Sequence, residues 1–240
     1  MESATYTTLG TCRGSFGIRW HGEGDGPVVL CQHGFPDDAS TFDGLAAHLA
    51  DAGLRVAAVN LRGYAPSALE GPLDLPELVA DLLAVVDELS PNAPVGFVGH
   101  DFGAQLGYPA MATAPHRFAA AVLLSGAHPA FTVRNARRSL RQLWWVKGTL
   151  AASMPAPVAM YRAGGFDVAE QPIDVPTLVI NGADDGCARP FPCDGQDRLF
   201  TSAYRAETWP RTGHFPHLEH PGRTAQSVLA WLTPHLTTAH

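Results

Sequence analysis

The chain has 240 residues, of which 46% are hydrophobic and 16% charged, and its formal net charge at pH 7 is −7. This length predicts one domain with a substantial core, and the acidic balance leaves no basic surface for a nucleic acid. No stretch approaches the ~18–20 apolar residues of a membrane span, and the start MESATYTTLG lacks the regions of a secretion signal, so we expect a cytoplasmic protein.

Strand-like and helix-like runs alternate along the chain, which predicts an α/β fold with a mostly parallel sheet. Residues 15–34 read as two strands joined by a glycine-rich turn, and residues 75–89 have the apolar face of an amphipathic helix. The other expected elements are a helix at 41–52, strands at 54–60 and 94–99, a helix from residue 101, strands at 119–126, 176–182 and 206–211, and a final helix at 222–236.

Residues 129–172 interrupt this alternation, because they show no strand pattern but several prolines, glycines and aromatic residues. We therefore expect a single domain, residues 1–240, with a short helical lid inserted at about 129–172. Trp144, Trp145 and Tyr161 are candidates for lining a substrate pocket under this lid. The same residues can instead seat the lid on the core, and the sequence leaves both interpretations open.

The segment GHDFGAQ, residues 99–105, follows an apolar strand and opens the next helix. A glycine–x–residue–x–glycine run at this junction is typical of the tight turn that holds a nucleophile above a sheet. Its central residue is Asp101, which is expected either to attack a substrate or simply to cap the helix. Gly99 and Gly103 leave room for the turn, and the backbone N–H of Phe102 is predicted to face the reacting centre.

A second segment, HGFPDD at residues 33–38, follows the first buried strand. The backbone N–H of Phe35 is predicted to form an oxyanion hole together with that of Phe102. The bond from Phe35 to Pro36 is a candidate for a cis peptide bond. His33 and Pro36 are expected to border the substrate.

A carboxylate and a histidine follow the last two predicted strands. His214 lies after a glycine in RTGHFPHLEHP, residues 211–221, where it can act as a general base. Asp185 or its neighbour Asp184 can orient the imidazole, and the glycine–x–x–aspartate spacing favours Asp185. The order Asp101, carboxylate, histidine is the order typical of an α/β-hydrolase.

As a set, the motifs HGFP, GHDFGA and GHFPHLEHP resemble those of the α/β-hydrolase superfamily, in the branch of epoxide hydrolases and haloalkane or haloacetate dehalogenases. The resemblance covers nearly the whole chain, including NLRGYAPS at residues 60–67. It implies an α/β-hydrolase fold with helices on both faces of the sheet. It also implies that Asp101, Asp185 and His214 act through a covalent ester and an activated water, with no metal and no organic cofactor.

An aspartate nucleophile suits attack on a saturated carbon. A serine would form an ether there, which water does not readily cleave, whereas Asp101 would form an ester that water hydrolyses. A departing halide needs N–H donors, and Phe35 and Phe102 occupy the two positions where the dehalogenases of this branch place asparagine and tryptophan. The sequence thus favours hydrolysis of epoxides to vicinal diols, with Tyr161 as the candidate acid.

Two alternatives remain open at this stage. One is a haloalkane or haloacid dehalogenase on the same fold, and the other is a non-hydrolytic binding protein or pathway auxiliary. The expected partners are a small electrophilic substrate and water, without a nucleic acid or a membrane. We expect a monomer or a homodimer.

Overall fold

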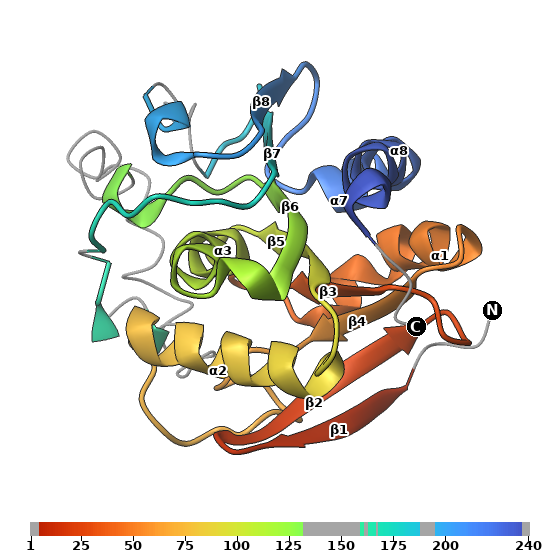
Figure 1. Cartoon of the computed structure of the whole chain (residues 1–240), viewed down its shortest axis with the longest axis vertical. Coiled ribbons are helices and arrows are strands. Elements are labelled where there is room, and N and C mark those ends of the chain that lie inside the picture. Colours follow the sequence, from red (N-terminus) through yellow and green to blue (C-terminus); the bar gives the residue numbers. More distant parts are fainter. Residues whose placement is uncertain (1–4, 132–158, 161–162, 167, 188–194, 237–240) are drawn as a thin grey trace.

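The structure is a computed structural model, in which helices cover both faces of one sheet (Figure 1). It describes residues 5–131, 159–160, 163–166, 168–187 and 195–236. The strands of the described part are β1 (Tyr6–Thr11), β2 (Gly14–His21), β3 (Val28–Gln32), β4 (Arg55–Val59), β5 (Val95–His100), β6 (Phe118–Leu124), β7 (Thr177–Gly182) and β8 (Tyr204–Trp209). They form an eight-stranded sheet in the order β1-β2-β4-β3-β5-β6-β7-β8.

The sheet is mostly parallel, as predicted. The pairs from β4 through β3, β5, β6 and β7 to β8 are parallel, whereas β1, β2 and β4 pair antiparallel. The strands β2 and β3, which follow each other in the sequence, are not neighbours, because β4 lies between them. Strand β1 was not predicted, since none of its residues is buried and it lacks an apolar run.

The helices pack in two layers. On one face lie α2 (Leu75–Leu89) and α3 (Phe102–Thr113), and on the other lie α1 (Asp43–Asp51) and α8 (Pro221–Leu232) (Figure 1). Helix α2 has the predicted bounds and begins where the side chain of Asp74 accepts a hydrogen bond from the N–H of Glu77 at 3.3 Å. The predicted final helix ends earlier, at Leu232, and continues as a 3-10 turn over Thr233–His235.

The core lies on both faces of the central strands. In β3, Val28 and Leu30 pack toward α2 and α3, while Val29 and Cys31 pack toward α1 and α8. Successive side chains of a strand point to opposite faces, so a strand covered on both sides needs an unbroken apolar run. This is why the central strands were easy to locate in the sequence.

The predicted lid at 129–172 lies between β6 and β7, and most of it falls outside the described residues. Trp144, Trp145 and Tyr161 are among the residues that the structure does not describe.

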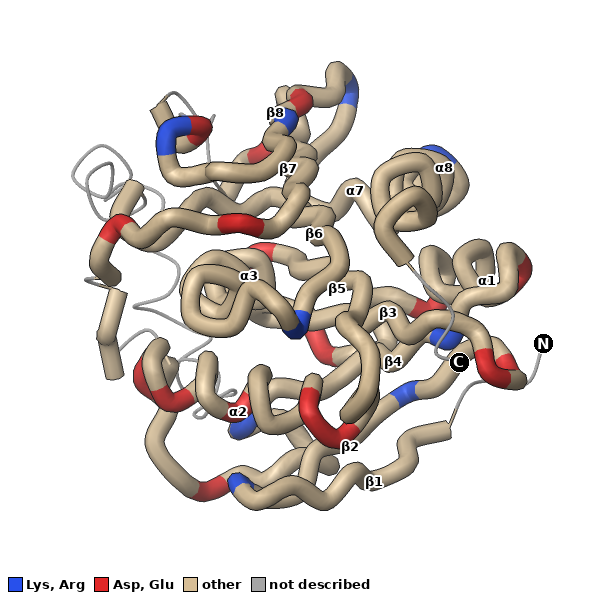
Figure 2. The backbone as a smooth tube through the Cα atoms, in the orientation of Figure 1, with Lys and Arg blue, Asp and Glu red and all other residues tan. Residues whose placement is uncertain are grey.

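The charged residues of the described part are spread along the chain. In Figure 2 several blue positions lie next to red ones, and the blue positions do not gather in one part of the described chain. None of the described helices is both long and apolar enough to cross a membrane.

Candidate functional site

Asp101 lies at the tight turn between β5 and α3. Its backbone has φ 50° and ψ −114°, a left-handed conformation that non-glycine residues seldom adopt. Its side chain makes no capping hydrogen bond to the helix. The carboxylate is therefore held above the sheet edge and turned away from the cap position, which removes the simple explanation of Asp101 as a helix cap.

Close packing at this turn requires glycine on both sides of Asp101. A Cβ atom at Gly99 would lie 2.7 Å from the Cα of Ala104, and one at Gly103 would lie 2.1 Å from the carbonyl oxygen of Gln32. The strand, the turn and the start of α3 therefore approach β3 more closely than any side chain would permit.

The loop after β3 contacts the carboxylate through its backbone. The N–H of Phe35 donates to Oδ1 of Asp101 at 3.1 Å, and the bond from Phe35 to Pro36 is cis, as the sequence indicated. A Cβ atom at Gly34 would lie 2.5 Å from Oδ1 of Asp101 and 2.6 Å from the backbone nitrogen of Phe102. The two N–H groups predicted to form an oxyanion hole thus belong to segments packed directly against each other.

His214 lies next to Asp101, and Asp185 lies next to His214; both come from the C-terminal half of the chain. The Nε2 atom of His214 lies 3.4 Å from Oδ2 of Asp101, and its Nδ1 atom lies 2.8 Å from Oδ2 of Asp185. The other oxygen of Asp185 accepts from the N–H of Cys187 at 2.8 Å. Asp184 is exposed, so Asp185 is the carboxylate that orients the imidazole.

Burial and charge act in opposite directions on these groups. Burial alone lowers the pKa of His214, but its hydrogen bonds and charge interactions with Asp101 and Asp185 outweigh this effect and raise the pKa to about 11. Burial likewise acts to raise the pKa of Asp101, but its interactions with His214 hold the pKa below its usual range. Asp101 and His214 therefore form an ion pair in the resting protein.

His33 and Pro36, in the loop after β3, were both predicted to border a substrate. The side chain of His33 supports this loop instead of reaching its surface. Its side chain is fully buried, with Nδ1 donating to the carbonyl of Gly34 at 2.9 Å and Nε2 accepting from the N–H of Leu61 at 3.1 Å. Burial lowers its pKa to about 4, which keeps the imidazole neutral. Pro36 is exposed, so it can contact a molecule that approaches the loop.

Sequence reasoning gave no role to Tyr64, whose ring lies edge-on to His33 with 4.6 Å between centroids. Its hydroxyl is buried and has no hydrogen-bond partner among the described residues. Burial raises the pKa of this hydroxyl, and the nearby charge of Asp101 raises it further. The motif NLRGYAPS identified this loop in the sequence, but not that the charge of Asp101 would act on the Tyr64 hydroxyl.

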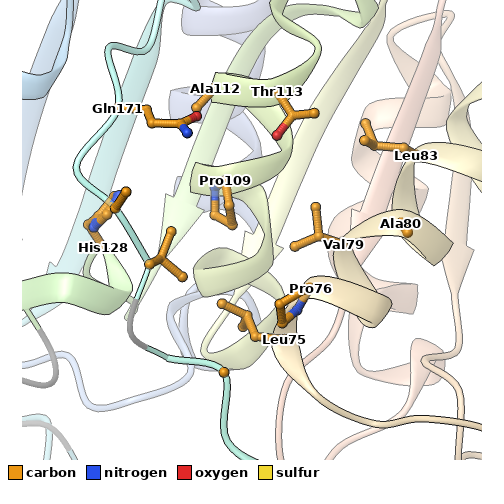
Figure 3. Close-up of a pocket in the computed structure, with 13 residues that line it drawn as sticks. Leu75, Pro76, Val79, Ala80, Leu83, Pro109, Ala112, Thr113, His128 and Gln171 are labelled. Carbon is orange, nitrogen blue, oxygen red and sulfur yellow. The ribbon is translucent and has the colours of Figure 1, made fainter.

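A pocket of about 350 Å³ lies elsewhere, between α2 and α3 (Figure 3). It is lined mainly by apolar side chains such as Leu75, Val79 and Pro109, with His128 at its margin. Its lining includes none of the triad-like residues Asp101, Asp185 and His214. We therefore place the candidate site at the strand edge and not in this pocket.

Two groups of three side chains in the described part have ligand atoms within 4.8 Å of one another and so could hold a metal ion. One contains Asp185, Cys187 and His214, but there Nδ1 of His214 is already used in the bond to Asp185. The other contains Asp37, His100 and His217 and lies next to the triad. None of these three was predicted as a site residue, because they come from distant segments with no ligand spacing.

The alpha/beta hydrolase fold family matches residues 27–163, which is more than half of the chain. The chain belongs to the α/β-hydrolase fold family. The matched segment of this α/β-hydrolase contains β3 and the loop that follows it, together with β5 and the tight turn at Asp101. Asp185 and His214 follow it in the order that the fold requires.

Among proteins of known function, this α/β-hydrolase is similar to epoxide hydrolase A of Mycobacterium tuberculosis, with 39% identity over 108 residues, and to an epoxide hydrolase of Caballeronia sordidicola, with 38% over 109 residues. Each match covers 43% of this chain, and 33% and 32% of the two relatives, so about a third of their length is matched. A solved structure of novel epoxide hydrolases from metagenomes of hot environments superposes with a TM-score of 0.83 over 96% of this chain and 99% of that one. The identity is 19%, so this likeness shows the fold.

Proposed function

We propose that this α/β-hydrolase hydrolyses epoxides to vicinal diols through an ester formed on Asp101. One observation carries the proposal: a carboxylate stands at the nucleophile turn with one oxygen at the Phe35 N–H and the other facing the imidazole of His214. The similarity to epoxide hydrolases over part of the chain supports the same substrate class.

The two oxygens of Asp101 have different roles in this scheme. Oδ2 attacks a ring carbon of the epoxide, the carbon–oxygen bond of the ring breaks, and the ring oxygen takes a proton from an acid. Oδ1 becomes the ester carbonyl and stays beside the Phe35 N–H, with the Phe102 N–H as the second expected donor. When water attacks the ester, negative charge develops on Oδ1, where each donor contributes ~2.7–4 kcal/mol to the transition state.

The ion pair also gives His214 a way to change from a cation to a base. Before the reaction, the charges of Asp101 and Asp185 keep its pKa high. Formation of the ester removes the charge of Asp101, so the pKa of His214 falls and its Nε2 proton is released to solvent. The neutral imidazole can then accept a proton from the water that attacks the ester. Asp185 remains bonded to Nδ1, which leaves Nε2 as the atom that takes this proton.

The group that protonates the ring oxygen is expected in the segment inserted between β6 and β7. Tyr161 is our candidate, and it lies outside the described residues. The side chains of Phe35 and Phe102 are buried and carry no N–H donor, which favours an epoxide over a halide at these two positions. We therefore rank dehalogenation below epoxide hydrolysis.

The decisive experiment is to trap the ester. His214→Gln in the full chain is incubated with styrene oxide and analysed by intact mass and peptide mapping. We expect an added mass equal to one epoxide on the peptide that contains Asp101, and no adduct in the double variant that also carries Asp101→Asn. Diol formation by Asp101→Asn at the rate of the unaltered protein would contradict the proposal.

A parallel incubation with haloalkanes separates the two leaving groups. Release of halide with an alkyl adduct on Asp101, and no reaction with epoxides, would favour the dehalogenase. In the unaltered protein, a single turnover in H₂¹⁸O should place ¹⁸O in the carboxylate of Asp101, because water attacks the ester carbonyl and not the substrate carbon.

A further inference from the structure

Three side chains of types that can bind a metal ion lie close together next to His214. Asp37 follows β3, His100 is the last residue of β5, and His217 lies in the short helix α7 (Pro216–Glu219). One ligand atom from each residue lies within 4.8 Å of the other two. Both histidines are fully buried, whereas Asp37 is partly exposed.

The tautomer of His100 follows from its single hydrogen bond. Its Nε2 atom lies 2.9 Å from the backbone carbonyl oxygen of His214. A carbonyl only accepts, so Nε2 carries the hydrogen and Nδ1 of the neutral ring is a bare lone pair. This Nδ1 atom is buried and has no hydrogen-bond partner among the described residues.

The tautomer of His217 follows in two steps. The hydroxyl of Thr41 donates its hydrogen to Oδ2 of Asp37 at 2.7 Å, so its oxygen can only accept from Nε2 of His217 at 2.9 Å. The Nδ1 atom of His217 is then a second bare lone pair, and it too lacks a partner in the part of the chain that the structure describes. Burial lowers the pKa of both imidazoles, which keeps them neutral.

The group therefore brings together two imidazole lone pairs and a carboxylate, all of them acceptors. The ring centroids of His100 and His217 are 4.5 Å apart, and one nitrogen of each ring lies within 4.8 Å of the other and of a carboxylate oxygen of Asp37. Buried acceptors without a donor are destabilising. A bound water molecule could donate to only two of these three acceptors, because it has two hydrogens. A divalent cation would interact favourably with all three.

We propose that Asp37, His100 and His217 form a binding site for a divalent transition-metal ion such as Zn²⁺ or Co²⁺. Imidazole nitrogen and carboxylate oxygen are ligands that these ions prefer. Bonds of ~2.0–2.2 Å place two ligand atoms at most ~4.4 Å apart, so the ion would draw the three side chains slightly together. The partly exposed Asp37 provides the route of entry.

This site is separate from the proposed epoxide chemistry, since neither step of that reaction uses the ion. Its effect would be structural. Asp37 lies two residues after Phe35, His100 precedes Asp101, and His217 follows His214, so the ion would join the three segments that carry the candidate active site.

The test uses Co²⁺ and the full chain after treatment with a chelator. We expect uptake of one ion per chain, a visible d–d absorption band and a higher thermal midpoint. Asp37→Asn, which replaces the anionic ligand by a neutral amide, and His217→Phe, which removes a ligand, should each weaken Co²⁺ binding by more than the ~10–100-fold typical of losing a partner outside the ligand set. The phenylalanine preserves the stacking of residue 217 on Phe42, whose ring centroid lies 4.9 Å away.

Cys187→Ser is the matched control, because it alters the second group of possible ligands and should leave Co²⁺ binding unchanged. The proposal is overturned if the unaltered protein takes up no Co²⁺, which is the outcome expected of a bound water alone. It is equally overturned if binding persists in Asp37→Asn and His217→Phe, or is lost in Cys187→Ser. Should either variant fail to fold, anomalous scattering from a Co²⁺-soaked crystal of the unaltered protein decides between these outcomes.

Discussion

The Nδ1 atom of His214 lies 2.8 Å from Oδ2 of the buried Asp185, while the adjacent Asp184 is exposed. Asp185→Asn keeps the shape of this contact but no longer stabilises the imidazolium or fixes its tautomer. We expect it to lower kcat for an epoxide by about 10⁴-fold, as for the corresponding change in a serine protease triad. Asp184→Asn is the matched control and should leave kcat unchanged; equal losses in the two variants would refute the assignment.

Gly34→Ala tests the contact between the loop after β3 and the nucleophile turn. The new Cβ would lie 2.5 Å from Oδ1 of Asp101, so the loop must shift and the Phe35 N–H must move away from the carboxylate. We expect kcat to fall by about 10²–10³-fold, the loss typical of one oxyanion donor. Gly10→Ala, where a Cβ meets nothing within 4 Å, serves as the comparison, with circular dichroism to confirm that both variants fold.

Asp101→Asn tests the ion pair without any substrate. Removing one of the two carboxylates that raise the pKa of His214 should lower that pKa from about 11. An NMR titration of the imidazole in metal-free protein measures the change directly. An unaltered pKa in Asp101→Asn would show that the ion pair does not control His214.

The same pair should appear in the pH dependence of stability. The pKa of His214 in the folded protein is above its ordinary value of 6.5, so its contribution is present in full below pH 6.5 and is lost as the pH rises through about 11. In Asp101→Asn this contribution should be smaller, and its loss should be complete at a lower pH. Denaturant titrations of metal-free protein at several pH values measure the difference.

Asp81 provides a test of stability away from the site. Its side chain is 4% exposed and accepts from Nε of Arg62 at 2.6 Å and from Nε of Arg13 at 2.7 Å. Asp81→Asn leaves the buried guanidinium of Arg62 without its counter-charge, while Arg13 keeps its pair with Glu77, and we expect the free energy of unfolding to fall by ~3–5 kcal/mol. Asp87, which is 65% exposed and pairs with Arg117, is the matched control, and Asp87→Asn should cost at most ~1 kcal/mol.

Much of the fold was predictable because its signals are local. The apolar runs of the central strands and the amphipathic pattern of α2 follow from burial on one or both faces. The residues of the triad-like group could be located as well, since each follows a strand at the same edge of the sheet. Their distances could not be predicted, because they depend on how β5, β7 and β8 are placed in the sheet.

What the sequence did not reveal depends on contacts between distant segments. His33 was expected to border the substrate, but it is fully buried and its ring nitrogens contact the backbone of its own loop at Gly34 and of the loop after β4 at Leu61. Unlike His33 and His214, His217 was not singled out by its place in a motif, and its tautomer follows from a contact with the distant Thr41. The edge strand β1 has no buried run, so only its partner β2 identifies it.

The chain between β6 and β7 supplies neither Asp101 nor the two groups that act on it. Under the proposed function, changes at this junction would alter the expected acid and the substrate contacts while leaving Asp101, Asp185 and His214 in place. A fragment that stops before β7 would lose not only Asp185 and His214 but also the strands β7 and β8 of the sheet, so it would keep neither the proposed imidazole nor the complete fold.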